Sequence, residues 1–217
     1  MSRADAPTRL TDRKRAAIVE AAVAEFRAAG YEATSMDRVA ASAGVSKRTV
    51  YNHFPSKEAL FGHIVEDMMA RGSDEGATPY RADAPLRAQL LELVQHKLRL
   101  LHDPDFSDLA RVAIAAGMHS PDLARELMQR LGQREHAMTT WVRAAVADGR
   151  LRATDPAFAA MQLESLIKGF AFWPQLAMAQ PLLDDARQEA VATSAVDMFL
   201  AYYGEAGKRP ASVRRPS

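Results

Sequence analysis

The 217-residue sequence contains no cysteine. Disulfides, zinc fingers, thiolate metal sites, iron–sulfur clusters and cysteine nucleophiles are therefore excluded together. Long apolar runs are also missing, because no stretch approaches the roughly 18–20 residues that a membrane helix needs. The first residues, MSRADAPTRLTDRKR, hold no apolar segment typical of a secretory signal. We therefore expect a cytoplasmic protein that does not use a membrane.

The sequence also lacks the common catalytic motifs. It contains no HExxH, G-x-S-x-G, P-loop or dinucleotide-binding pattern. Its six histidines are scattered, and none forms the Glu-x-x-His repeat of a di-iron bundle. The sequence therefore predicts no catalytic residue, no metal site and no cofactor.

The net charge of only +1 conceals an uneven distribution. Residues 1–60 contain ten Lys and Arg against seven Asp and Glu, whereas residues 61–217 contain eighteen against twenty. A basic N-terminal quarter beside an acidic remainder is compatible with nucleic-acid binding through the N-terminus.

Residues that favour helices dominate throughout, and no stretch alternates apolar with polar residues as a strand does. The sequence predicts an all-α fold of about nine helices, with an internal break at Pro174. Three of the helices are short and lie between Thr34 and about Arg71. The longer ones are expected at about Thr11–Ala29, Leu86–His102, Phe106–Met118, Pro121–Ala147, Pro156–Met178 and Leu182–Tyr203.

The segment Thr34–Lys57 has the pattern of a helix-turn-helix. Thr34 followed by Asp37 resembles a capping box, and the first short helix ends at Gly44. Ser46 is placed to cap the second helix. In that helix Val50 and Phe54 face the core, which leaves four side chains on the outside: Lys47, Arg48, Tyr51 and Asn52.

Those four side chains suit double-stranded DNA. Lys and Arg bind guanine edges or phosphate, Asn pairs with adenine, and Tyr offers a ring to a thymine methyl group. His53 ends this helix, and Lys57 stands at the start of the next one, where a phosphate is favoured.

The segment as a whole, from Ile18 and Phe26 through Ala43-Gly44-Val45-Ser46 to Lys57, resembles the N-terminal domain of the TetR family of bacterial transcriptional repressors. The resemblance implies a three-helix DNA-binding domain at residues 11–56. It also implies that Lys47, Arg48 and Asn52 tend to face bases. The positions that match phosphate or groove contacts in the family are Ser35, Arg38, Thr49, Tyr51, His53 and Lys57.

The later part of the chain more loosely resembles the AefR-like regulatory domains of that family, in stretches such as LARVAIAAGMHSPDL and LIKGFAFWPQL. The resemblance implies an effector-binding and dimerisation domain at residues 57–204. A flexible N-terminus (1–10) and a disordered basic tail (205–217) are expected to flank the two domains. Met and aromatic residues line adaptable apolar pockets, so a small apolar effector is expected at Met118, His119, Met138, Trp141, Phe170 and Trp173.

Two helices in the last third of the chain are expected to form a homodimer. Because one short recognition helix contacts little DNA, twofold symmetry is needed to read two major grooves. The interface residues are predicted to be Leu163, Leu166, Phe170, Val191, Ala195, Met198 and Phe199. The sequence thus predicts a ligand-responsive repressor of a palindromic operator. A helical sensor without specific DNA binding and an all-α enzyme remain as alternatives.

Overall fold

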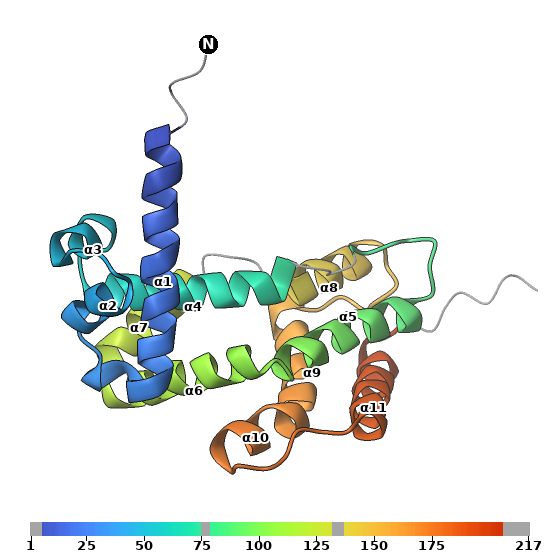
Figure 1. Cartoon of the computed structure of the whole chain (residues 1–217). Coiled ribbons are helices and arrows are strands. Elements are labelled where there is room, and N and C mark those ends of the chain that lie inside the picture. The colour runs from blue at the N-terminus through green and yellow to red at the C-terminus, as the bar shows by residue number, and fades with distance from the viewer. Residues whose placement is uncertain (1–5, 75–78, 132–136, 206–217) are drawn as a thin grey trace, which may run out of the picture. The chain divides into compact units, whose positions relative to one another are not determined.

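The computed structural model describes residues 6–74, 79–131 and 137–205. Within these ranges the regular elements are helices (Figure 1), and the β contact is an isolated antiparallel bridge between Leu151 and Gly204. The prediction of an all-α fold is confirmed. The chain divides into two compact units, which we call unit 1 (described residues 6–72 and 103–131) and unit 2 (described residues 73–74, 79–102 and 137–205).

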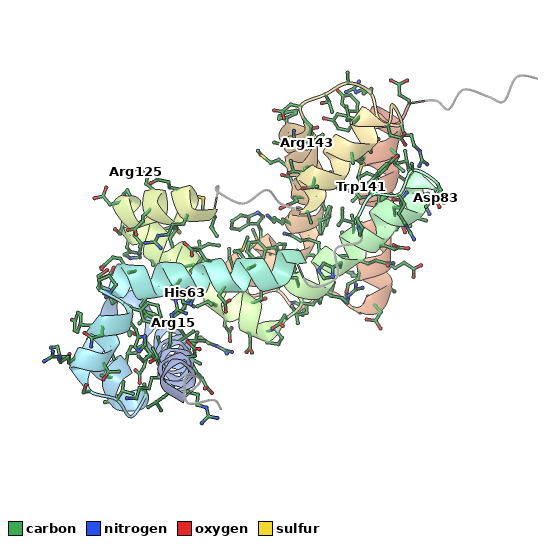
Figure 2. The ribbon with its side chains drawn as sticks, turned by 90° about the horizontal axis from the view of Figure 1, so that it is seen from above. Arg15, His63, Asp83, Arg125, Trp141 and Arg143 are labelled. Carbon is green, nitrogen blue, oxygen red and sulfur yellow. The ribbon has the colours of Figure 1, made fainter. Side chains whose placement is uncertain are left out.

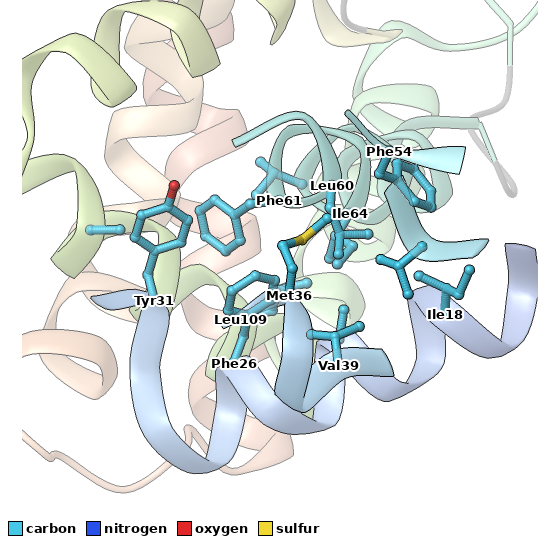
Figure 3. Packing of buried hydrophobic residues seen from close by; sticks show 14 of the residues in the cluster. Ile18, Phe26, Tyr31, Met36, Val39, Phe54, Leu60, Phe61, Ile64 and Leu109 are labelled. Carbon is cyan, nitrogen blue, oxygen red and sulfur yellow. The ribbon is translucent and has the colours of Figure 1, made fainter. Parts of the chain in front are cut away.

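Unit 1 is built from six helices. They are α1 (Ala6–Ala33), α2 (Met36–Ser42), α3 (Lys47–His53), α4 (Lys57–Asp74), α6 (Pro104–His119) and α7 (Pro121–Leu131). Helix α1 packs against α2, α3 and α6, and α6 packs against α7. A single hydrophobic core, to which all six helices contribute, joins them (Figure 3).

Three aromatic rings form the centre of this core. The ring of Phe61 on α4 meets the edge of Phe26 on α1, with 4.9 Å between centroids, and lies 4.8 Å from the ring of Tyr31. All three side chains are buried. Because aromatic pairs in these geometries add to the free energy of burial, this contact is a main link between α1 and α4.

The junction between α1 and α2 depends on Gly30, whose φ of 77° interrupts the helical geometry of α1. Glycine adopts this left-handed conformation without a steric penalty. The hydroxyl of the buried Thr34 then donates to the carbonyl oxygens of Gly30 at 2.8 Å and Glu25 at 3.1 Å. These bonds satisfy carbonyl groups that the end of the helix leaves open.

Unit 2 contains α5 (Leu86–Leu101), α8 (Ala137–Ala147), α9 (Pro156–Ala171), α10 (Trp173–Ala177) and α11 (Asp185–Tyr203). Helix α11 packs against α5 and α9, and α8 packs against α9. The buried Gln89 on α5 holds the chain that leads into its helix, because its amide bonds to the backbone of Arg81 and Ala84.

Several predicted helix bounds are corrected. Within the helix expected at Pro121–Ala147, the structure describes α7 and α8, which belong to different units, and residues 132–136 lie outside the described residues. The break expected at Pro174 is confirmed but lies at Phe172, while Pro174 stands in the first turn of α10, where its missing N–H costs little.

The predicted domain limits differ from the compact units. Helix α1 begins at Ala6, so residues 6–10 are helical where a flexible N-terminus was expected. Helices α6 and α7 pack in unit 1, although they fall inside the segment 57–204 that was predicted to bind an effector. Residues 206–217 of the predicted basic tail lie outside the described residues. The functional division therefore stays a prediction.

Candidate nucleic-acid interface

Helices α2 and α3 are short and are joined by a tight turn. The Ser46 hydroxyl caps α3 by accepting from the Thr49 backbone N–H at 3.1 Å. Gly44 occupies the turn with a φ of 63°, a conformation that favours glycine. Val50 and Phe54, one helical turn apart, are buried in the core. The sequence prediction of a helix-turn-helix is confirmed in its geometry.

Burial of Val50 fixes which face of α3 meets solvent. Lys47, Arg48, Tyr51 and Asn52 are all exposed, as predicted. Tyr51 retains 43% of its accessible surface, a large value for an aromatic side chain. The Lys47 Nζ atom lies 6.0 Å from the centroid of the Tyr51 ring. This face combines cations, an amide and an aromatic ring, which together can contact phosphates and base edges.

Two of the expected DNA contacts already have a structural task. Ser35, rather than Thr34, caps α2, because its hydroxyl accepts from the Arg38 backbone N–H at 3.3 Å. The predicted Thr34–Asp37 capping box is therefore wrong. Thr49 shares a hydrogen bond of 2.8 Å with Ser46. Ser35 is exposed and Thr49 is half-buried, so both side chains remain accessible to solvent. Their contacts with DNA stay predictions.

Lys57, at the start of α4, is engaged within unit 1. Its ammonium group donates to the Tyr31 carbonyl oxygen at 2.9 Å and lies 4.2 Å from the centroid of the Tyr31 ring. The Tyr31 hydroxyl in turn donates to Glu58 at 3.0 Å. Lys57 and the neighbouring His53 are both half-buried, and their contacts with phosphate also stay predictions.

The end of α3 is connected to α1 and α4 through a small charged and aromatic cluster. The Arg15 guanidinium donates to His63 Nε2 at 2.9 Å (Figure 2). Both groups lie against the ring of Phe54. Because arginine only donates, His63 is neutral in this arrangement. Burial first, and then the Arg15 charge, lower the pKa of His63, while Asp67 and Glu66 act in the opposite direction.

The lowered pKa of His63 predicts a loss of stability in acid. As the pH falls below about 6.5, His63 binds a proton in the unfolded chain but stays neutral in the folded chain until a lower pH. The free energy of unfolding should therefore decrease between about pH 7 and pH 5. The pH dependence should be weaker in His63→Gln, which keeps a polar side chain but does not titrate. Denaturant titrations of both proteins across this range measure the difference, and parallel pH profiles would contradict the assignment.

The six residues expected to bind an effector occupy three settings. Met118 and His119 end α6 in unit 1, where both are exposed. Met138 and Trp141 on α8 are buried in unit 2, where the Trp141 ring (Figure 2) meets Tyr80 edge-on at 5.5 Å. Phe170 and Trp173, near the junction of α9 and α10, are exposed. The effector site stays a prediction.

The expected dimer residues divide by burial within the protomer. Leu163, Ala195 and Phe199 are buried, Leu166 and Val191 are half-buried, and Phe170 and Met198 are exposed. Between α9 and α11 lies an open groove of about 430 Å³. Leu166, Met198 and Phe199 line it, and it also contains residues that the sequence analysis did not assign to an interface: Met161, Gln162, Ser165, Tyr202 and Tyr203.

The described part of the chain holds neither a membrane-spanning helix nor a metal-binding cluster. None of its helices has the length and apolar character needed to cross a bilayer. Across the same residues, no group of three or more His, Asp or Glu side chains is arranged to hold a metal ion.

Comparison with known proteins identifies similar sequences and structures. Residues 18–64 match the bacterial regulatory proteins of the tetR family, and residues 88–205 match the AefR-like transcriptional repressor C-terminal domain. The HTH-type transcriptional regulator RutR of Escherichia coli is 28% identical over 155 residues, which cover 69% of each chain.

Two solved structures extend the similarity over most of the chain. A TetR family transcriptional regulator from Pseudomonas syringae is 49% identical, with a TM-score of 0.76 over 89% of this chain and 98% of that one. The flavonoid-responsive regulator FrrA is 26% identical, with a TM-score of 0.75 over 90% of this chain and 99% of its own.

Proposed function

This chain belongs to the tetR family of bacterial transcriptional regulators, and we propose from that premise that it is a repressor that binds a palindromic operator as a homodimer. The family is one of helix-turn-helix DNA-binding regulators and not of enzymes. The observation that carries the proposal is the exposed face of α3. Its four side chains, Lys47, Arg48, Tyr51 and Asn52, point to solvent and do not belong to the hydrophobic core. On operator DNA in the cytoplasm, this face would enter the major groove.

Binding of DNA from a random-sequence pool tests this proposal. Two recognition helices related by twofold symmetry read half-sites about 34 Å, or one helical turn, apart. Repeated selection should therefore enrich an inverted repeat with this spacing. Recovery of DNA without a shared motif would contradict sequence-specific binding, and a single unrepeated motif would contradict the dimer.

The groove between α9 and α11 supports the proposed dimer. Its rim carries exposed Met161, Met198 and Tyr202, which would be covered by the same groove of a second copy. Contiguous exposed apolar side chains are typical of interfaces. An isologous contact of this kind closes after two subunits.

A charge placed in this groove should dissociate the dimer. Met198 is 49% exposed within the protomer, so Met198→Glu leaves the protomer core intact. In the dimer the new carboxylate would be buried without a partner, and we expect self-association to weaken about a hundredfold. Sedimentation velocity measures the change. Met128→Glu, at an exposed methionine of α7 in unit 1, is the matched control and should leave the dimer unchanged. Equal behaviour of the two variants would refute this interface.

We further propose that a small apolar effector releases the operator. The match to AefR-like domains and the flavonoid response named for FrrA support an organic effector. Among the predicted ligand residues, Met138 and Trp141 face the interior of unit 2 and are the strongest candidates for direct contact. By binding more tightly to a state in which α4 has shifted and the recognition helices are wrongly spaced, the effector would lower operator affinity.

A further inference from the structure

Lys47 is the first residue of α3 and lies on the face expected to meet DNA. It forms an ion pair with a carboxylate of the same unit. Its Nζ atom lies 2.8 Å from Oδ1 and 3.0 Å from Oδ2 of Asp37, the second residue of α2. Both side chains are mostly exposed, at 60% and 64%. The hydrogen bond with Asp37 raises the pKa of Lys47.

Two other cations near this face, Arg38 and Arg48, differ in whether they form an ion pair. Arg38 pairs with Glu25 of α1 at 2.7 Å, and Glu25 is held by the Ser42 hydroxyl at 2.5 Å. Arg48 is exposed, and none of the residues that the structure describes forms an ion pair with it. Arg48 can therefore bind a phosphate without giving up another contact. Lys47 must first break its ion pair with Asp37 or bind phosphate and Asp37 together.

The Asp37–Lys47 pair is poorly explained as a stabilising contact. Exposed ion pairs contribute little to folding, and the favourable place of the Asp37 carboxylate in the first turn of α2 does not require Lys47. On the face expected to meet DNA, however, this carboxylate neutralises a cation that would otherwise attract phosphate. The Asp37 carboxylate thus reduces the attraction between Lys47 and DNA.

We propose that Asp37 is a positioning residue that holds Lys47 beside Tyr51 and weakens binding to DNA of any sequence. This proposal rests on the proposed DNA-binding function. Because this restraint must be broken on DNA of any sequence, tight binding then depends on the base contacts that only a matched operator supplies. Lys47 exchanges Asp37 for DNA when such an operator is bound.

Salt-dependent DNA binding of the full-length protein and Asp37→Asn tests the proposal. Both are titrated with the selected operator and with scrambled DNA of equal length. We expect the variant to bind both DNAs about three- to tenfold more tightly at low salt. The slope of log K against log salt should steepen by up to about 0.9, which corresponds to one additional phosphate contact. Asp37→Glu should restore the wild-type values, since it keeps the charge.

A double-mutant cycle separates restraint of Lys47 from a general charge effect. Measured in a Lys47→Gln background, Asp37→Asn should improve binding by less than about twofold, because the restrained cation is absent. An undiminished gain in that background, or no gain in the single variant, would overturn the proposal. Circular dichroism checks that the variants fold, and Asp37→Ser replaces Asp37→Asn if the latter does not. Wild-type protein that binds neither DNA would refute the proposed function itself, independently of the Asp37 variants.

Discussion

Replacing Phe61 by alanine should lower the free energy of unfolding of unit 1 by about 3–5 kcal/mol, the usual cost of removing a buried aromatic ring. The ring is fully buried and contacts Phe26 and Tyr31, so its loss leaves a cavity between α1 and α4. Phe61 lies in the same core as Val50 and Phe54. We therefore expect the variant to lose DNA binding as well, although Phe61 does not belong to the exposed face of α3.

The two tryptophans allow the effect to be assigned to a unit. Trp141 and Trp173 both lie in unit 2, so their fluorescence follows that unit, whereas circular dichroism follows the helices of both. In denaturant the helical signal of Phe61→Ala should decrease at lower concentration than in the wild type. Leu10→Ala, at an exposed position of α1, is the control and should shift the free energy by less than about 0.5 kcal/mol. Phe61→Ala that unfolds like the control would contradict the packing described for unit 1.

Tyr51→Ala should weaken operator binding by about 1–3 kcal/mol, or roughly fivefold to more than a hundredfold. Tyr51 lies in the middle of the exposed face of α3 and contributes little to the core, since 43% of its surface is accessible. Its removal deletes a ring that can contact a thymine methyl group and a hydroxyl that can reach a phosphate. It also removes the ring beside the Lys47 ammonium group.

Titration of labelled operator DNA measures this change, and thermal unfolding provides the control for folding. Tyr51→Phe separates the two contributions, because it keeps the ring and removes only the hydroxyl. We expect its affinity to lie between those of the wild type and Tyr51→Ala. Unchanged operator affinity in Tyr51→Ala, with the fold intact, would exclude this face of α3 as the DNA-reading surface.

The helix-turn-helix could be predicted because its determinants are close together in the chain. Ser46 caps α3 through a residue only three positions away, and Gly44 occupies the turn between the two helices. The spacing of Val50 and Phe54 then fixes which side chains face outwards. Each of these signals is local, so the sequence alone carries them.

The errors arose where the outcome depends on packing between elements and not on the pattern within one helix. Thr34 resembles a helix cap in the sequence, but the fold buries it and directs its hydroxyl to Gly30 and Glu25. The contacts of Arg15 with His63 and of Arg27 with Asp105 and Asp108 join residues far apart in sequence. No helical periodicity predicts such pairs.

The predicted effector residues show the same limit. Met138 and Phe170 are both large and apolar, and the sequence does not distinguish them. Packing in unit 2 buries the first and exposes the second. Composition can therefore identify a segment rich in pocket-forming residues, but the tertiary fold decides which of them face inwards.

The most direct test of the central claim is a fluorescence-anisotropy titration of the purified protein on DNA from immediately upstream of its own gene. Scrambled DNA of the same composition is titrated in parallel, at two salt concentrations. We predict binding in the nanomolar range that prefers the upstream DNA and weakens as salt increases. Equal and weak binding to both DNAs, by protein that denaturing mass spectrometry shows to be free of small molecules, would contradict the account of a regulator that binds next to its own gene.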